Sequence, residues 1–135
     1  MKVGKKIGVI DSQDALIGHP AYDLVSLVDD VRIKTSIKLK NQIYNYYLKK
    51  TSKIYKTNSK KFLEDFKILS VQRSLKIIGV FSRLFIRDKK KQYLKFMPYT
   101  WQLLETRMNS EIFSGLKKIL NSNISKRFKR KIILK

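Results

Sequence analysis

Hydrophobic side chains recur along most of this sequence at spacings of three and four residues, the period of an amphipathic helix. The longest such stretch runs from about 60 to 85, and shorter ones cover about 21–31 and 36–50. Two further helical patterns begin near Pro98 and Ser110. These patterns predict a mainly α-helical protein.

The stretch 21–31 differs from the others because it is apolar on nearly every side. Its apolar residues are Tyr22, Leu24, Val25, Leu27 and Val28. Pro20 precedes it, where the first turn of a helix accepts a residue without an N–H group. A helix that is apolar all round is expected to be covered on all sides, so we expect this helix to be buried.

One segment, Lys6–Ile10, has the β-branched character of a strand and ends at Asp11. A strand needs partners for its backbone N–H and C=O groups. The sequence therefore predicts one short N-terminal strand or hairpin. Either another chain supplies the partner strand, or the N-terminal part of the domain is absent.

Composition excludes several classes of protein. The 135 residues include no Cys, which excludes disulfide frameworks, Cys-based zinc sites and a Cys nucleophile. No apolar run reaches the roughly 18 to 20 residues that span a bilayer, and Met1–Lys6 lacks an apolar signal-peptide core. We therefore expect a cytoplasmic protein without a membrane partner.

The formal net charge of +21 suggests binding to nucleic acid. However, Lys greatly outnumbers Arg and is spread over most segments, whereas phosphate clamps concentrate Arg on one face. The charge therefore favours no specific nucleic-acid function, and a basic nucleic-acid-binding module is kept as an alternative. The basic run Lys126–Lys131 is interpreted as a frayed, solvated terminus rather than a phosphate or membrane-surface anchor.

Asp11 is the residue whose position suggests chemistry. A carboxylate directly after a buried strand is fixed yet open to solvent, as a Mg²⁺ ion bridging nucleotide phosphates requires. An Asp at the end of a strand is also a common turn or N-cap residue. From the local pattern, both interpretations stay open.

Motifs around Asp11 carry a resemblance to a known family. They are Ile10-Asp11-Ser12 and Gly18-His19-Pro20-Ala21-Tyr22-Asp23-Leu24. In this order they resemble the segment after the catalytic loop in the aminoglycoside phosphotransferase and choline kinase family, which shares the protein kinase fold. Further positions resemble its branch of kinases that phosphorylate N-acetylmuramate and N-acetylglucosamine at the anomeric hydroxyl. These are Gln72-Arg73, Lys76–Phe81, Arg83-Leu84, Tyr93-Leu94, Pro98 and Trp101.

The resemblance covers about Ile7 to Leu120. It implies that residues 1–121 form a partial, helical C-terminal lobe of a protein-kinase-like fold, followed by a basic tail at 122–135. It also implies ATP-dependent transfer of a phosphoryl group to a hydroxyl of a small sugar or amino sugar, with Mg²⁺ as the cofactor.

Roles for individual residues follow from the same resemblance. Asp11 would coordinate Mg²⁺ and contribute to binding the nucleotide. Asp23 would support the catalytic loop by accepting hydrogen bonds from its backbone, although a carboxylate near a helix N-terminus is also favoured by the helix dipole alone. Arg73, Lys76 and Arg83 are candidates to contact the acceptor sugar, although solvated or ion-paired roles are favoured.

The sequence also departs from the family. Ser12 stands where an aromatic residue is usual. The catalytic loop, which supplies the base, and the nucleotide-binding lobe would lie upstream of Met1. We therefore expect the chain to be inactive alone, and to need a separate N-terminal kinase chain unless it is a relic or has a misassigned start. A pseudoenzyme interaction module is the remaining alternative.

Three more residues are interpreted as structural. His19, in a turn before Pro20, has no adjoining carboxylate motif and is not expected to act as a base. Asp14 is interpreted as a cap of the following turn, and Trp101 as a core residue.

Overall fold

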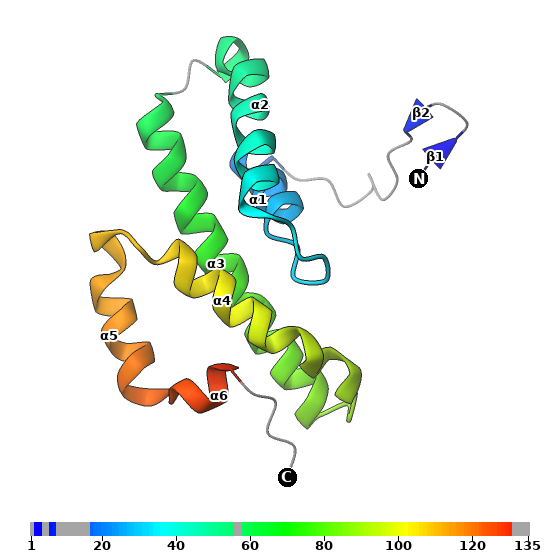
Figure 1. Ribbon diagram of the computed structural model, residues 1–135, viewed down its shortest axis with the longest axis vertical. Helices are drawn as coiled ribbons and strands as arrows, with labels where there is room; N and C mark the ends of the chain where they lie inside the picture. Colours follow the sequence, from blue (N-terminus) through cyan, green and yellow to red (C-terminus); the bar gives the residue numbers. More distant parts are fainter. Residues whose placement is uncertain (1, 4–5, 8–16, 56–57, 131–135) are drawn as a thin grey trace.

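The structure is a computed structural model that describes residues 2–3, 6–7, 17–55 and 58–130. Figure 1 shows the elements in chain order. They are β1 (Lys2–Val3), β2 (Lys6–Ile7), α1 (Ala21–Val28), α2 (Ile37–Tyr55), α3 (Ser59–Ile86), the 3-10 helix η2 (Lys91–Phe96), α4 (Met97–Arg107), the 3-10 helix η3 (Glu111–Phe113), α5 (Ser114–Asn123) and α6 (Lys126–Arg130). The prediction of a mainly helical protein is confirmed.

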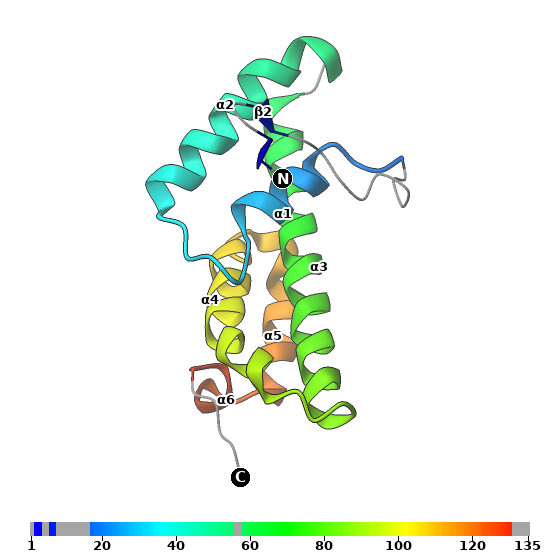
Figure 2. The same cartoon turned by 90° about the vertical axis from the view of Figure 1, so that its right-hand side faces the viewer.

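Helix α3 is the long central helix against which α1, η2 and α4 pack. The side chain of Asn58 caps it, since Oδ1 accepts hydrogen bonds from the backbone N–H groups of Lys60 at 2.9 Å and Lys61 at 3.3 Å. Helix α1 lies against its first half and α4 against its second half (Figures 1 and 2). The helix predicted at 60–85 is therefore confirmed, and it continues without interruption through Gly79.

Two hydrophobic cores lie along α3. The first, between α1, α2 and α3, contains Ala21, Leu24, Val25, Val28, Phe62 and Phe66. The second, between α3, α4 and η3, contains Val71, Trp101, Leu104, Met108 and Phe113. The interpretation of Trp101 as a core residue is confirmed.

Helix α1 is buried on one face only. Leu24, Val25 and Val28 pack into the first core, whereas Tyr22 is 39% exposed and Leu27 is 65% exposed. The expectation of burial on all sides is therefore wrong for the part of the chain that the structure describes. Its physical cause is that, within the described ranges, α1 packs against α2 and α3, and the side chains of Tyr22 and Leu27 are not covered by them.

The predicted N-terminal strand is seen at Lys6–Ile7 and pairs antiparallel with Lys2–Val3. Its partner is the preceding part of the same chain, an arrangement that belongs to the hairpin alternative and not to a partner strand from another chain. The remainder of the predicted strand, residues 8–10, lies outside the described residues.

The basic tail contains ordered structure, because α6 packs against α4. Lys129 is only 2% exposed. Its Nζ atom donates a hydrogen bond of 2.8 Å to Asn121 Oδ1 and lies 3.5 Å from Glu105 Oε1 and 5.4 Å from the centre of the Trp101 ring. The interpretation of a frayed terminus is wrong for 126–130, because the ammonium group finds specific partners while its alkyl stem is covered.

Over the described ranges, no helix has both the length and the apolar character needed to cross a membrane.

Candidate functional site

The most densely bonded polar cluster is centred on Asp29, at the C-terminal end of α1. Its Oδ1 atom accepts hydrogen bonds from Lys40 Nζ at 2.8 Å and Arg107 Nη2 at 2.9 Å. Its Oδ2 atom accepts from Ser70 Oγ at 2.6 Å and Arg107 Nε at 2.8 Å. These donors lie on α2, α3 and α4, so a single carboxylate links four helices.

The Asp29 carboxylate is stabilised in its charged form. Burial by itself raises the pKa of this carboxyl, but the hydrogen bonds and charge of Arg107, with hydrogen bonds from Lys40 and Ser70, bring the pKa below its ordinary 3.8. Asp29 is therefore ionised at neutral pH. Because two buried cations surround one carboxylate, the cluster has a net positive charge.

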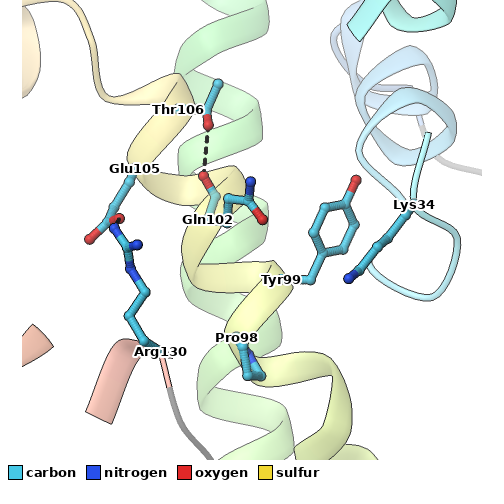
Figure 3. A pocket seen from close by; sticks show the side chains of 7 residues that line it. All are labelled: Lys34, Pro98, Tyr99, Gln102, Glu105, Thr106 and Arg130. Atoms are coloured by element: carbon cyan, nitrogen blue, oxygen red, sulfur yellow. Dashed lines mark hydrogen bonds and ion pairs between the residues drawn. The ribbon is translucent and has the colours of Figure 1, made fainter. Parts of the chain in front are cut away.

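Beside this cluster, helix α4 and the segment between α1 and α2 enclose two adjoining pockets. The first has a volume of about 520 Å³ and is lined by Lys34, Pro98, Tyr99, Gln102, Glu105, Thr106 and Arg130 (Figure 3). The second, of about 310 Å³, is lined by Thr35, Ile37, Lys40, Tyr99, Gln102, Leu103, Thr106 and Arg107. The two share Tyr99, Gln102 and Thr106, and together we call them the α4 groove.

Two ammonium groups approach the same aromatic ring in the α4 groove. The Nζ atoms of Lys34 and Lys40 lie 5.6 Å and 5.9 Å from the centre of the Tyr99 ring, within the range of cation–π attraction. Figure 3 shows Lys34 reaching this ring from the segment opposite α4. Asp29 neutralises Lys40, whereas no carboxylate of the described chain pairs with Lys34.

On the other side of the groove, the charges are paired. Arg130 Nη2 lies 3.6 Å from Glu105 Oε2, and the two side chains face each other in Figure 3. The hydroxyl of Thr106 donates to the backbone carbonyl of Gln102 at 2.8 Å. The groove therefore has an anion-favouring end at Lys34 and an ion-paired end at Arg130.

Two of the carboxylates predicted from the sequence, Asp11 and Asp14, lie outside the described residues, so the Mg²⁺ assignment stays a prediction. Asp23 lies in the first turn of α1 and is exposed. Its side chain makes no hydrogen bond within the described ranges, so the simpler role it retains there is a favourable interaction with the helix dipole. Its role toward a catalytic loop also stays a prediction.

The three candidate substrate contacts on α3 do not converge on one point. At about 1.5 Å of rise per residue, Arg73 and Arg83 are about 15 Å apart along the helix axis. Lys76 and Arg83 are exposed, and Arg73 is half-buried. The Nε atom of Arg73 is buried and has no hydrogen-bond partner among the described residues. Of the three, Arg73 is therefore the one with unused donor capacity inside the protein.

The positive charge of Arg73 acts on a nearby carboxylate. The pKa of Asp30 is lowered chiefly by its hydrogen bonds from Arg32 and, to a smaller extent, by the charge of Arg73. Arg32 binds both oxygens of Asp30, with Nε at 3.1 Å and Nη2 at 2.7 Å. Arg73 therefore lies near an ion pair without joining it.

His19 has a carboxylate neighbour that the sequence did not indicate. Its Nε2 atom lies 3.3 Å from Asp65 Oδ2 on α3, while Nδ1 accepts a hydrogen bond of 3.1 Å from the backbone N–H of Ala21. No carboxylate motif adjoins His19 in the sequence, and the partner in space comes from a distant helix. Since Nδ1 is engaged by the backbone, these contacts support a structural role at the start of α1.

Asp29, Lys40, Tyr99 and Arg107 were all missed by sequence reasoning. One signal was present, because Asp29 follows Val28 directly and stands four residues after Val25, on the face of α1 that is buried. A carboxylate on an apolar face needs buried partners. Nothing in the sequence indicates which cations those partners are.

In the part of the chain that the structure describes, no group of three or more His, Cys, Asp or Glu side chains is arranged to hold a metal ion.

Comparison with known proteins finds curated relatives for about two thirds or more of this chain. No family model matches the chain. It is 33% identical over 100 residues to a protein of Caulobacter vibrioides, covering 74% of this chain and 27% of that protein. It is 35% identical over 102 residues to a protein of Pseudomonas aeruginosa (73% and 30%) and 37% identical over 94 residues to one of Neisseria meningitidis serogroup B (67% and 28%).

All three of these relatives are named N-acetylmuramate/N-acetylglucosamine kinase. The chain spans less than a third of their length. The similarity to sugar kinases therefore concerns one segment of those proteins.

Proposed function

We propose that this chain supplies the helical part of an ATP-dependent kinase that phosphorylates a hydroxyl of a small sugar or amino sugar. The observation that carries the proposal is the similarity, over about two thirds or more of the chain, to proteins named as sugar kinases. A mainly helical architecture is compatible with the C-terminal lobe of a protein-kinase-like fold at residues 1–121, with 122–135 as a basic extension. The remaining parts of the kinase belong to another segment or another chain.

Asp11 is the proposed Mg²⁺ ligand of this chain. Mg²⁺ in nucleotide sites is held by one or two carboxylates together with phosphate oxygens and water. One carboxylate is therefore a sufficient contribution from this chain. When bound, Mg²⁺ would neutralise charge on the phosphoryl group that is transferred.

The outward face of α1 is the surface that the rest of the kinase would cover. It carries the carboxylate of Asp23, which is exposed and unbonded within the described ranges, and the exposed side chains of Tyr22 and Leu27. Asp23 can accept hydrogen bonds from the backbone N–H groups of a catalytic loop. Burial of the two apolar side chains would favour that contact.

Arg73 is the strongest of the three candidate substrate contacts. Its guanidinium group has a buried Nε atom without a partner, and an acceptor hydroxyl or carboxylate could satisfy such a donor. Lys76 and Arg83 are exposed, so solvated roles fit them better.

The proposal is tested with a chimera. The part of the Caulobacter vibrioides kinase that precedes the matched segment is fused to this chain, and ATP turnover is measured with N-acetylglucosamine. We expect Mg²⁺-dependent turnover that Asp11→Ala abolishes and Asp88→Ala, at an exposed ion pair after α3, leaves unchanged.

A chimera that unfolds cooperatively and binds ATP but transfers no phosphoryl group to any amino sugar would refute the proposed function. Full activity of the Asp11→Ala chimera would refute the metal assignment alone.

A further inference from the structure

The α4 groove collects more positive charge than the neighbouring carboxylates neutralise. Its cationic lining residues are Lys34, Lys40, Arg107 and Arg130. Against these stand two carboxylates, Asp29 at the inner end and Glu105 at the outer end. Glu105 is also 3.5 Å from the ammonium group of Lys129, so it is shared between two cations. A surplus of positive charge therefore remains in the groove, and it favours an anion.

The surplus charge is concentrated beside Tyr99. The ammonium groups of Lys34 and Lys40 both lie within 6 Å of the centre of this ring. Lys40 is fixed by its contact with Asp29 and its side chain is only 6% exposed, whereas Lys34 is exposed and has no carboxylate partner in the described ranges. Two like charges beside one ring repel each other, and an anion placed near both would reverse that repulsion. A fixed and a free ammonium group thus lie near the same ring, and the free one, at Lys34, is available to a negatively charged group.

The rest of the lining suits a hydroxylated ring. The half-buried Tyr99 ring offers a flat apolar surface, and neither its hydroxyl nor the side-chain amide of Gln102 forms a hydrogen bond with the described residues. The hydroxyl oxygen of Thr106 donates to a backbone carbonyl and keeps its acceptor capacity. These groups lie together on α4 (Figure 3). The first pocket, at about 520 Å³, has the size of small-molecule sites, roughly 300 to 1,000 Å³.

We propose that the α4 groove binds a small phosphorylated sugar. Its phosphate lies beside Lys34, near the ammonium group of Lys40, and its ring lies against Tyr99 with hydroxyl groups toward Gln102 and Thr106. Sugar phosphates are also the product class of the proposed kinase. The groove is inferred from its own lining residues, however, and its test requires no turnover.

The test is calorimetric titration of the full chain, at constant ionic strength, with N-acetylglucosamine 1-phosphate, N-acetylglucosamine and inorganic phosphate. We expect the sugar phosphate to bind at least tenfold more tightly than either of the other two. Lys34→Gln should weaken that binding about tenfold, since a hydrogen bond to a charged group is lost. The exposed Lys34 makes no core contact, so this variant should keep the wild-type melting curve.

Three further variants distinguish binding in the α4 groove from a nonspecific effect of charge. Lys118→Gln removes the same charge from an exposed position on α5, outside the groove, and should bind the sugar phosphate like the wild type. Tyr99→Phe keeps the ring and should retain most of the affinity, whereas Tyr99→Leu should lose several-fold.

Three outcomes would overturn the inference. One is binding of inorganic phosphate as tightly as the sugar phosphate, and another is an equal loss of affinity in Lys118→Gln and Lys34→Gln. The third is displacement of the sugar phosphate by a single-stranded oligonucleotide whose affinity is insensitive to Lys34→Gln, because this would indicate a diffuse polyanion surface. None of these outcomes bears on whether the chimera is a kinase.

Discussion

Arg107, the last residue of α4, donates hydrogen bonds of 2.8 Å and 2.9 Å to the two carboxylate oxygens of Asp29, which follows α1. The two residues are separated by 78 positions in the sequence. The pair is bidentate, with the Asp29 side chain 2% exposed and that of Arg107 15% exposed, so each partner depends on the other for compensation of its charge. The effects of altering it differ from those of altering an ion pair at the surface.

Substitution of Asp29 is expected to be strongly destabilising. Asp29→Asn leaves Lys40 and Arg107 buried without a negative partner, and the loss of one partner from a buried pair lowers the free energy of unfolding by about 3 to 5 kcal/mol. The free energy of unfolding is measured by urea denaturation monitored by circular dichroism.

The neighbouring residue provides the control for that substitution. Asp30→Asn breaks a pair with the exposed Arg32 and should lower the free energy of unfolding by less than about 1 kcal/mol. Equal effects at the two positions would contradict the account of the Asp29 cluster.

Stability should fall in acid through Asp29. Because its pKa is lowered from 3.8 in the folded protein, the folded state binds fewer protons than the unfolded state between the two pKa values. The contribution of Asp29 to the free energy of unfolding is fully present above pH 3.8. It is lost as the pH falls through the lower pKa of the folded state. Carboxyl ¹³C NMR titration of Asp29 measures the shift directly.

Ser70→Ala supplies the internal comparison for this titration. It removes one hydrogen bond to the carboxylate, so the pKa of Asp29 should rise toward its ordinary value. A midpoint at or above 3.8 in the wild type would show that burial, which raises the pKa, outweighs the hydrogen bonds.

Docking of α6 should be visible in the fluorescence of Trp101, the single Trp of the chain. Lys129→Ala removes the side chain that covers the ring and the hydrogen bond to Asn121, so emission should shift to longer wavelength. The free energy of unfolding should fall by about 1 to 3 kcal/mol. Emission is recorded under native conditions and through a urea series.

Two variants in α6 serve as controls for the Lys129→Ala result. Lys129→Met keeps much of the stem that covers Trp101 and should shift the emission less. Lys126→Ala, at an exposed position of α6, should leave the Trp101 emission unchanged. An unchanged spectrum in Lys129→Ala would mean that α6 does not cover Trp101 in solution.

The sequence predicted the elements better than their contacts. Apolar spacing located the long helix α3 nearly to its ends, since a periodic pattern reports which face of a helix is buried. It could not say what covers that face. Leu27 belongs to a pattern that predicted complete burial, yet it is exposed, because the packing partners of a helix are a property of the whole fold.

The same limit explains the polar residues that were missed. The contacts of His19 with Asp65 and of Asp29 with Arg107 join residues far apart in the sequence. No local sequence pattern specifies either contact. Lys129 was interpreted as part of a solvated run because its neighbours are basic, whereas its burial depends on Trp101 and Glu105 of another helix. Asp11 remains a prediction from its motif.

The position of Arg107 has a consequence for how the protein unfolds. Its guanidinium group lies 5.0 Å from the centre of the Phe66 ring, in the first core, while its own helix contributes Trp101 and Leu104 to the second. The two cores have no residue in common. Helix α3 contributes to both cores, and through Asp29 and Phe66 the side chain of Arg107 adds a second link between them. The two cores should therefore melt as one unit, and loss of that side chain should make the calorimetric transition broader.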